Sequence, residues 1–443
     1  MKKNNSIKIL FYGGLANNLY VTAKCLQNYG FSVNFIRDIS DQYAMSQPIW
    51  EDKEIVLNIA KNNIPNTSAD WNVFEKKKKW RCPSWLIDIK LKNYSKNYLF
   101  SAKDKKSTII RNKYFFKPQY KKLSSFQREI VEKMKYYDIV FVCGIEGARL
   151  AFLSKRPYVI YPHGGDFRLA MGFPKLKFEI SFNYFNEWVR RKEIATAFKE
   201  ANYILSPNGN PSQIVSLNSE KFINKKKILY FPTPIKTRQR KNIEERLLIR
   251  RKIFKKFSIK LNPLNLTFFV PSRIDFYWKG HDKLINVIKN LPRDINFIFM
   301  GWGPDREKVI SICKKKKINK QICFLNFIAS KPVLYNFMDM SDAVIDQFKI
   351  GVFGTSTIES LAGSIPVLTY LNDDNFTKYK ISQPPLINCK TEDDIESSIN
   401  LIIKDSEYLE RVSLEIKKWY KRTHEPENVS ILMKEVVRKI LFK

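Results

Sequence analysis

The chain has 443 residues, of which 44% are hydrophobic and 14% aromatic, a composition that excludes global disorder. Its length favours two α/β domains of about 200 residues each. The six scattered cysteines indicate reduced thiols in a cytoplasmic protein. No run of about 18 apolar residues is present to span a bilayer. The formal net charge of +35 attracts nucleic acid, anionic lipid or small anions without choosing among them, unless it reflects only a lysine-rich solvated surface.

The amino end predicts a β–α–β unit. A strand over residues 7–12 runs into Gly13 and Gly14, a helix follows over 17–29, and a second strand covers 32–36. The glycine spacing differs from that of a dinucleotide fingerprint, so nicotinamide binding is weakly supported. The apolar stretch before the glycines is too short for an export signal.

Residues 38–120 show no clean periodicity, but they contain a segment rich in tryptophan and lysine. Trp71, Trp80 and Trp85 are interleaved there with a lysine run at 76–79. Indoles beside lysines suit the headgroup region of an anionic membrane, with Trp80 and Trp85 inserting. The same composition suits stacking on nucleic-acid bases, or a solvated loop whose tryptophans belong to the core.

Regular elements resume after residue 120 and alternate between helix and strand up to the proline-containing segment ILYFPTPIK. The sequence TRQRKNIEER that follows it is typical of a domain linker. We therefore expect the first domain to end near residue 240. The elements predicted in this stretch are helices over 125–135, 148–153 and 183–200 and strands over 139–143, 158–161 and 203–206.

A histidine follows the strand over 158–161, in the segment PHGGD. The chain has three histidines, and we interpret His281 as a helix-start residue and His424 as a linker residue. His163, in contrast, lies at a glycine-rich strand end with Asp166 beside it. A neutral imidazole there could hydrogen-bond a sugar hydroxyl or a phosphate, which favours an active-site role over that of an ordinary turn histidine.

The second domain opens with two basic residues in a strand-to-helix turn. An apolar strand over 266–270 leads into SRIDFYWKGHD, and a helical pattern follows over 282–291. Arg273 and Lys279 lie in this turn and could together neutralise a diphosphate leaving group. The alternative is a pair of solvated basic residues in a chain that has many of them.

Two further strand-to-helix turns carry glycine. One strand ends in GWGPD, with Gly301 and Gly303, and another over 342–345 leads through a glycine loop to a short helix over 355–362. Strand, glycine turn and helix in repetition describe a doubly wound α/β domain, which binds its ligand at the carboxyl ends of the strands. The second unit covers about residues 262–409.

The start of the short helix is suited to bind a diphosphate. The backbone amides of Gly354, Thr355, Ser356 and Thr357 are free there, and the helix dipole favours an anion. Glu359 lies in the first turns of the same helix. It either relieves the helix dipole or accepts hydrogen bonds from a ribose diol, and its residue type alone does not choose between these roles.

A catalytic metal ion is not indicated. No Asp-x-Asp follows a strand, and the acidic pairs at 373–374 and 393–394 lie in polar stretches typical of surface turns. We therefore expect no metal site and no cofactor. Arg273 and Lys279 would supply the positive charge that a cation supplies elsewhere.

Together these motifs resemble the GT-B glycosyltransferases, specifically family 4, the group 1 sugar transferases. The similarity is strongest over residues 266–370. There SRIDFYWKGHD resembles the family's Arg/Lys-Gly donor-phosphate motif, FIFMGWGPDREKV its strand and Gly-x-Gly turn, and FGTSTIESLAGSIPV its signature loop and helix. Weaker similarity covers Gly13 and Gly14, the PHGGD segment and the TPIK end of the first domain.

The resemblance implies a role for each candidate residue. Arg273 and Lys279 would grip the donor diphosphate, and Glu359 would hold the ribose. His163, with Asp166 beside it, would lie near the transferred sugar as a catalytic group. The donor-binding set implied in this way consists of Gly13, Gly14, Arg273, Lys279, Gly301, Gly303, Gly354, Thr355, Ser356 and Glu359.

One departure from the family pattern concerns catalysis. The family usually has a second glutamate eight positions before the equivalent of Glu359, and this chain has Gly351 there. The change affects contacts to the sugar ring. Asp346, at the end of the preceding strand, is a candidate substitute.

From these observations we expect an α/β fold with two Rossmann-like doubly wound domains that face a cleft, the GT-B architecture. The predicted domains are an acceptor-side domain over 1–240, a donor domain for the nucleotide-sugar over 241–409, and helices over 410–443 that cross back to the first domain. Pro426 breaks this helical tail.

The expected function is transfer of a sugar from a nucleotide-sugar to a lipid-linked or surface-polysaccharide acceptor, such as a lipopolysaccharide intermediate. Retention of configuration is implied by the resemblance only. We expect the enzyme in the cytoplasm or peripherally on the inner face of the cell membrane, with nucleic acid disfavoured as a partner. The alternatives are a nucleotide-sugar epimerase-like enzyme and a catalytically inactive relative that binds glycan or nucleic acid.

Overall fold

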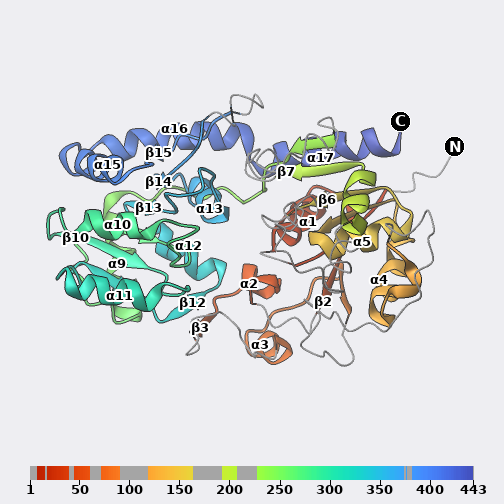
Figure 1. The fold of residues 1–443 in the computed structure, drawn as a ribbon, viewed down its shortest axis with the longest axis horizontal. Coiled ribbons are helices and arrows are strands. Elements are labelled where there is room, and N and C mark those ends of the chain that lie inside the picture. The colour runs from red at the N-terminus through yellow and green to blue at the C-terminus, as the bar shows by residue number, and fades with distance from the viewer. Residues whose placement is uncertain are drawn as a thin grey trace, which may run out of the picture. The chain divides into compact units, whose positions relative to one another are not determined.

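The computed structural model describes residues 7–14, 17–38, 44–59, 71–89, 118–162, 192–206, 227–373, 376 and 382–442. Packing groups them into two compact units (Figure 1). The first takes the described residues within 1–41, 81–231 and 430–443, and the second takes those within 42–80 and 232–429. The domain boundaries at residues 240 and 409 stay predictions. In the packing itself, the described residues within 42–80 group with the second unit.

The first unit contains a seven-stranded sheet in the order β4-β2-β1-β5-β6-β7-β8, and all of its strand pairs are parallel. Leu10, Val140 and Ile160 contribute to a core with helices α4 and α5. The elements are β1 (Lys8–Tyr12), α1 (Asn18–Asn28), β2 (Ser32–Asp38), β4 (Leu86–Ile89), η3 (Tyr120–Lys122), α4 (Ser125–Met134), β5 (Ile139–Cys143), α5 (Gly144–Ser154), β6 (Tyr158–Tyr161), β7 (Tyr203–Ser206) and β8 (Ile228–Tyr230).

The second unit contains a six-stranded parallel sheet in the order β11-β10-β9-β13-β14-β15. A separate antiparallel pair joins β3 to β12. The elements are η2 (Ala44–Ser46), α2 (Ile49–Asp52), β3 (Val56–Asn58), α3 (Trp71–Lys77), α9 (Ile243–Lys256), β9 (Leu266–Val270), α10 (His281–Ile288), β10 (Ile295–Phe299), α11 (Arg306–Lys315), β11 (Ile322–Phe324), β12 (Phe327–Ala329), α12 (Lys331–Asp339), β13 (Ala343–Ile345), α13 (Thr355–Ala362), β14 (Val367–Thr369), β15 (Ile387–Asn388), α15 (Glu392–Lys404) and α16 (Tyr408–Thr423). Helix α17 (Pro426–Leu441) begins in this unit and continues into the first.

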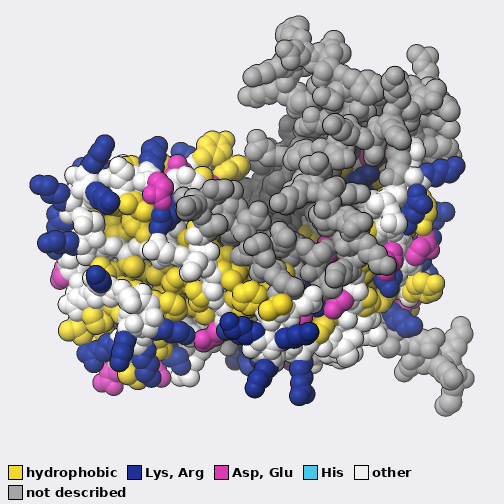
Figure 2. Space-filling model, turned by 90° about the horizontal axis from the view of Figure 1, so that it is seen from below, with side chains coloured by type: hydrophobic (Ala, Val, Ile, Leu, Met, Phe, Trp, Pro, Cys, Tyr) yellow, Lys and Arg dark blue, Asp and Glu magenta, His cyan; other side chains and the backbone are white. Residues whose placement is uncertain are grey.

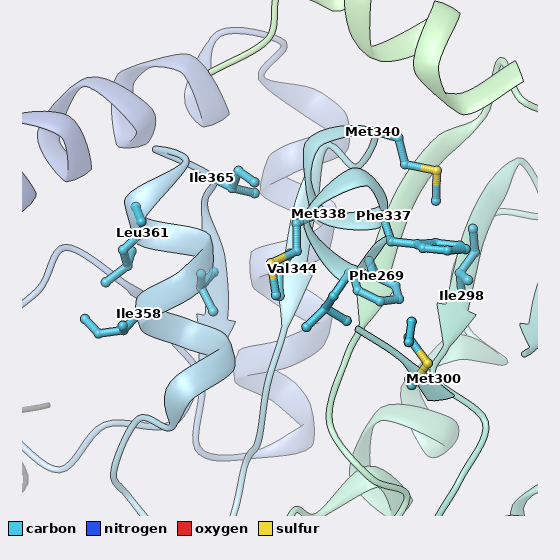
Figure 3. Close-up of a cluster of buried hydrophobic side chains, with 14 of the residues drawn as sticks. Phe269, Ile298, Met300, Phe337, Met338, Met340, Val344, Ile358, Leu361 and Ile365 are labelled. Carbon is cyan, nitrogen blue, oxygen red and sulfur yellow. The ribbon is translucent and has the colours of Figure 1, made fainter. Parts of the chain in front are cut away.

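The strands of the parallel sheet in the second unit are mostly apolar and buried because helices cover both faces of the sheet. On β9, Phe268 and Phe269 point into different cores, since successive side chains of a strand alternate between its faces. The core around Phe269 also contains Phe337 of α12 and Ile358 of α13 (Figure 3). The core around Phe268 includes side chains of α10, α11 and α15. This packing fixes the strand ends from which the loops of the candidate site extend.

Several local predictions agree with the structure. The strands expected over 139–143, 158–161 and 203–206 have those bounds. The helix expected over 125–135 is α4, which starts after a capping box in which Ser124 and Gln127 exchange hydrogen bonds. The helix expected over 148–153 was too short, because α5 already begins at Gly144, directly after β5. Of the helix expected over 183–200, residues 192–200 are helical and the rest lie outside the described residues.

The segment TRQRKNIEER, predicted to link the domains, packs against the second unit. Arg238 stacks on the Tyr335 ring at 4.1 Å, and Arg240 Nη2 donates to the Asp342 carbonyl over 2.8 Å. Helix α9 starts within the same segment, with a capping box between Asn242 and Glu245. Basic side chains of a charged segment can be buried when they donate hydrogen bonds to backbone carbonyls. Composition alone therefore does not show whether such a segment is exposed.

The tryptophan–lysine segment belongs partly to the core of the second unit. Trp71 is 2% exposed and packs edge-on against Trp50, while Trp80 is 9% exposed and its Nε1 donates to Asp52 over 2.9 Å. Trp85 belongs to the first unit, is half-buried, and stacks on Tyr20 with ring centroids 5.6 Å apart. The expected insertion of Trp80 into a membrane is therefore wrong, because the indole is already buried and hydrogen-bonded.

The surface charge is spread widely. Three of the four lysines at 76–79 are exposed. On the face shown in Figure 2, Lys and Arg side chains occupy several separate places with apolar side chains between them. Among the described helices, none has the length and apolar character that crossing a membrane requires. All six cysteines are free thiols.

Candidate active site

The candidate site lies at the carboxyl edge of the sheet in the second unit. The chain passes from β9 to β10 and β11 on one side of β9, and β13, β14 and β15 lie on the other side. The strand order therefore reverses between β9 and β13, and in open α/β sheets ligands bind outside the carboxyl ends of the strands at such a point. The loop after β9 carries Arg273 and Lys279, and the loop after β13 leads to the start of α13.

An ion pair joins these two loops. Lys279 Nζ lies 3.1 Å from Asp346 Oδ1, and the Asp346 side chain is 1% exposed. The other carboxylate oxygen accepts the hydroxyl of Thr357 over 2.7 Å and the amide of Gly354 over 3.3 Å, so the expectation that the Gly354 amide is free was wrong. Burial on its own raises the pKa of Asp346, but the Lys279 charge and these hydrogen bonds outweigh it and lower the pKa below the ordinary value.

The same pair places the Lys279 ammonium at the amino end of α13. A Cβ built on Gly354 would lie 3.9 Å from Lys279 Nζ. The amides of Thr355, Ser356 and Thr357 begin this helix and have no carbonyl partner within it. A cation and a helix amino end thus converge, which is an arrangement suited to a phosphate group.

Arg273 occupies the outer part of the same loop. Its Nη2 pairs with Asp275 Oδ2 at 3.0 Å, and 42% of its side chain is exposed, so the guanidinium can exchange this weak partner for a ligand anion. Asp275 is itself 4% exposed, and its other oxygen accepts the amide of Trp278 over 2.9 Å. Asp275 therefore fixes the loop that presents both basic residues, a role the sequence did not reveal.

His281 supports the loop after β9 from the interior of the domain. It is fully buried at the start of α10, and its Nδ1 accepts the backbone amide of Asp275 over 3.2 Å. Its Nε2 lies 3.2 Å from Ser272 Oγ, and that hydroxyl donates to the Asp346 carbonyl over 2.7 Å. Because Nδ1 accepts and the hydroxyl proton is used elsewhere, the ring is neutral with its proton on Nε2. Burial and the nearby Lys279 charge lower the pKa of His281 to about 4. The expectation of a helix-start residue is confirmed.

Gly301 and Gly303 support this loop by close packing. A Cβ on Gly301 would lie 2.0 Å from the Leu325 carbonyl oxygen, and one on Gly303, whose φ is +135°, would lie 2.2 Å from the Ile274 carbonyl oxygen. The Ile274 amide also donates to the Trp302 carbonyl over 2.7 Å. These contacts explain why both positions need glycine. Their assignment to donor binding stays a prediction.

Gly351 also has a structural requirement. Its φ is +71°, and a Cβ there would lie 2.9 Å from the Tyr370 ring and 3.1 Å from Asn372 Cβ. A glutamate at this position would strain the backbone and collide with both neighbours. Asp346 does not offer a free carboxylate in its place, because three groups already occupy its oxygens.

Glu359 lies deep in α13, and Lys331 is its ion-pair partner. The Glu359 side chain is 2% exposed and that of Lys331, the first residue of α12, is 16% exposed. Lys331 donates to Glu359 Oε1. Within the described part of the chain, Glu359 Oε2 is buried without a hydrogen-bond partner. Lys331 lies in none of the motifs that predicted the site.

The remaining predicted site residues divide into two groups. Gly13 and Gly14 follow β1, at the point where the strand order of the first sheet reverses between β1 and β5, and a Cβ on Gly13 would lie 2.8 Å from Cys143 Cβ. His163 and Asp166 lie outside the described residues. His424, expected in a linker, caps α16 and is buried. Within the described ranges, no group of three or more His, Cys, Asp or Glu side chains is placed to hold a metal ion.

One protein family matches part of the second unit. Residues 251–419 match the family model described as glycosyl transferases group 1. The matched segment lies within the second unit. It contains both loops of the candidate site, together with Lys331 and Glu359. The family 4 subclass stays a prediction, and no protein with a curated description matches the chain.

Solved structures of glycosyltransferases share the whole fold. Anabaena HepE in complex with UDP aligns with a TM-score of 0.59 at 12% identity, covering 98% of this chain and 100% of that chain. Sucrose-phosphate synthase from Thermosynechococcus elongatus aligns with a TM-score of 0.58 at 11% identity, covering 98% of each chain. The catalytic domain of starch synthase IV from Arabidopsis thaliana, bound to ADP and acarbose, gives 0.59 at 11% identity, covering 99% of this chain and 100% of that chain. The predicted α/β class with two Rossmann-like domains is confirmed.

Because His281 is buried and neutral, we expect the free energy of unfolding to decrease as the pH falls. Its folded pKa of about 4 lies below the ordinary 6.5, so between these values the unfolded chain binds a proton that the folded protein excludes. Its contribution to the free energy of unfolding is complete above pH 6.5 and is lost as the pH falls towards 4, by about 3 kcal/mol in all. Denaturant unfolding at pH 7 and pH 5 measures this loss.

The matched variants are His281→Gln and His424→Gln. We expect His281→Gln to show a smaller drop in stability from pH 7 to pH 5 than the wild type, because glutamine does not titrate. Burial lowers the pKa of His424 to about 3, and this residue lies outside the candidate site. We expect His424→Gln to reduce the drop in stability in the same way. An unchanged drop in His281→Gln would contradict the assignment of a neutral imidazole.

Proposed function

We propose that the protein is a glycosyltransferase that moves a sugar from a nucleotide-sugar to an acceptor. The observation that carries this proposal is the convergence of Lys279, Arg273 and the amino end of α13 at the strand-order reversal of a group 1 glycosyl transferase domain. A diphosphate is the ligand group that such a set of donors and charges binds best.

The charges act on the leaving group. When the bond between the sugar and the diphosphate breaks, negative charge grows on the phosphate oxygens. Lys279 is already oriented by Asp346, and the amides of α13 are fixed in the helix, so neither has to reorganise as this charge develops. Arg273 can leave Asp275 for the ligand at little cost because it is half-exposed. Positive charge placed in this way replaces a metal ion, and we propose that transfer needs neither a metal nor another cofactor.

The donor class, the acceptor and the stereochemistry are proposed from similar solved structures and from the family resemblance. The similar structures include HepE bound to UDP-glucose and starch synthase IV bound to ADP, which favours a nucleoside diphosphate sugar as donor. We propose a lipid-linked or surface-polysaccharide acceptor, net retention, and roles for His163 and Asp166 near the transferred sugar. We further propose that the enzyme works in the cytoplasm, reaching a membrane-bound acceptor through its lysine-rich surface.

Removing the basic residues should weaken the reaction. We expect Arg273→Ala and Lys279→Ala each to lower turnover of the nucleotide-sugar by at least about tenfold, the equivalent of about 1.4 kcal/mol of transition-state stabilisation. Nucleoside diphosphate affinity, measured by calorimetry, should fall as well. Lys289→Ala removes an exposed charge from the end of α10 and serves as the matched control. Wild-type rates in both site variants would disprove the assignment.

A second variant separates folding from function. Lys279→Ala leaves Asp346 buried without its cation, which destabilises the protein. In the double variant Lys279→Ala/Asp346→Asn, we expect the thermal midpoint to recover while turnover stays low. Recovery of turnover together with stability would show that Lys279 serves only the fold.

Chelation tests the proposed independence of metal ions. We expect turnover to survive an excess of EDTA, because Arg273, Lys279 and the α13 amides provide the positive charge. The measurement is release of nucleoside diphosphate before and after dialysis against EDTA. Loss of activity that Mg²⁺ or Mn²⁺ restores would contradict this part of the proposal.

Vesicle binding tests the proposed membrane contact. We expect the protein to sediment with phosphatidylglycerol vesicles at low salt and not with phosphatidylcholine vesicles, since each basic residue near an anionic surface contributes about 1 kcal/mol. Changing the four lysines at 76–79 to glutamine should reduce sedimentation without affecting nucleotide binding. The lysines at 314–317 have the same pattern of exposure and give a control with equal loss of charge. Equal effects of both changes would indicate a diffuse charge effect and refute a local contact.

A further inference from the structure

Glu359 has one carboxylate oxygen that the described protein leaves unused. Oε1 receives Lys331, whereas Oε2 is buried with no hydrogen-bond partner in the described part of the chain. A buried acceptor without a partner costs about 1–3 kcal/mol, more for a charged group, so proteins keep such atoms rarely. An unused carboxylate oxygen within a ligand-binding domain indicates a place for a donor that the ligand brings.

The surroundings of Glu359 hold it rigidly. Its backbone carbonyl accepts Arg238 Nη2 over 2.9 Å, and Arg238 also pairs with Asp339 at 3.3 Å and stacks on Tyr335. Burial, followed by the negative charges of Glu359 and Glu51, raises the pKa of Tyr335 well above its ordinary value, so its hydroxyl stays protonated. The helix position and the carboxylate are thus both fixed, and Glu359 cannot move far to meet a ligand.

Lys331 is equally well placed by the backbone around it. It follows Ser330, which is fully buried at the amino cap of α12. Ser330 Oγ accepts the amide of Ile55 over 2.8 Å, and the Ser330 amide donates to the Ile55 carbonyl over 2.9 Å. This reciprocal pair ties the start of α12 to the segment beside β3. The Lys331 backbone is therefore anchored, and its side chain is 16% exposed, against 2% for that of Glu359.

We propose that Lys331 is a positioning residue of the nucleotide subsite. By holding Oε1, it keeps Glu359 turned so that Oε2 accepts a hydroxyl of the ribose diol. A hydroxyl is the fitting donor because it is small, uncharged and able to donate to a carboxylate. The proposal rests on the function proposed above, and it adds a residue from another helix, 28 positions away in the chain.

The test compares nucleotides with and without the diol. The probes are UDP, ADP and GDP, each paired with its 2′,3′-dideoxy counterpart, and affinities are measured by calorimetry on the full chain. We expect the wild type to bind at least one diphosphate about tenfold or more tighter than its dideoxy form, since a site built for a hydroxyl rejects the analogue that lacks it. In Lys331→Met this ratio should fall to about threefold or less, and Glu359→Gln should lower it as well.

Two further variants control for the charge at position 331 and for the loss of a lysine elsewhere. Lys331→Arg keeps the cation and should preserve most of the ratio. Lys404→Met makes the same change at an exposed lysine of α15 and should leave it unaltered. If Lys331→Met weakens both ligands equally and the ratio stays constant, Lys331 supports the fold only and the inference is overturned.

The remaining outcomes are equally decisive. Tighter diphosphate binding by Lys331→Met would show that the lysine competes with the ligand, which also overturns the inference. A wild-type ratio near one, or an unchanged ratio in Glu359→Gln, would remove the ribose subsite while leaving the glycosyltransferase proposal intact. If the wild type binds none of the three diphosphates, the proposed function itself fails, and the inference fails with it.

Discussion

The ion pair between Lys279 and Asp346 joins the two loops on which the candidate site depends. Taking a carboxylate out of water is costly unless charge and hydrogen bonds replace the water. Here an ammonium, a hydroxyl and a backbone amide do so. Since the amide and the hydroxyl belong to the start of α13, the pair also fixes the distance between the Lys279 charge and the amino end of that helix. The Lys279 charge that we propose binds phosphate is therefore positioned by contacts within the protein.

A second constraint is the close approach of backbone to backbone around the loop after β9. Gly301 and Gly303 pack so tightly against Leu325 and Ile274 that no other residue fits without movement. His281 completes the support from inside the domain. Binding groups held in this way lose little freedom when a ligand arrives, which is the physical advantage of placing them on a rigid scaffold.

Gly351 shows why a sequence motif and its structural role must be considered together. Compared with the family pattern, the residue is a missing glutamate. In the structure it is a glycine with positive φ against Tyr370 and Asn372, so its loop follows a path that a glutamate would disfavour. The neighbouring Asp346 is committed to Lys279. The departure is thus a property of the loop and not of one side chain.

The sequence by itself determined the α/β class, several strands to the residue, and the position of Arg273 and Lys279 in one strand-to-helix turn. These follow from local information: apolar runs, glycine turns and the spacing of charges within one loop. It could not determine that Asp346, 67 positions from Lys279, is the partner of that lysine, or that Lys331 meets Glu359. It also gave no sign that the described residues within 42–80 pack with the second unit, and it left open whether Trp80 is buried. Such contacts depend on the order of strands in a sheet and on which segments pack together. The hydrophobic periodicity of a segment predicts its secondary structure but not its tertiary neighbours.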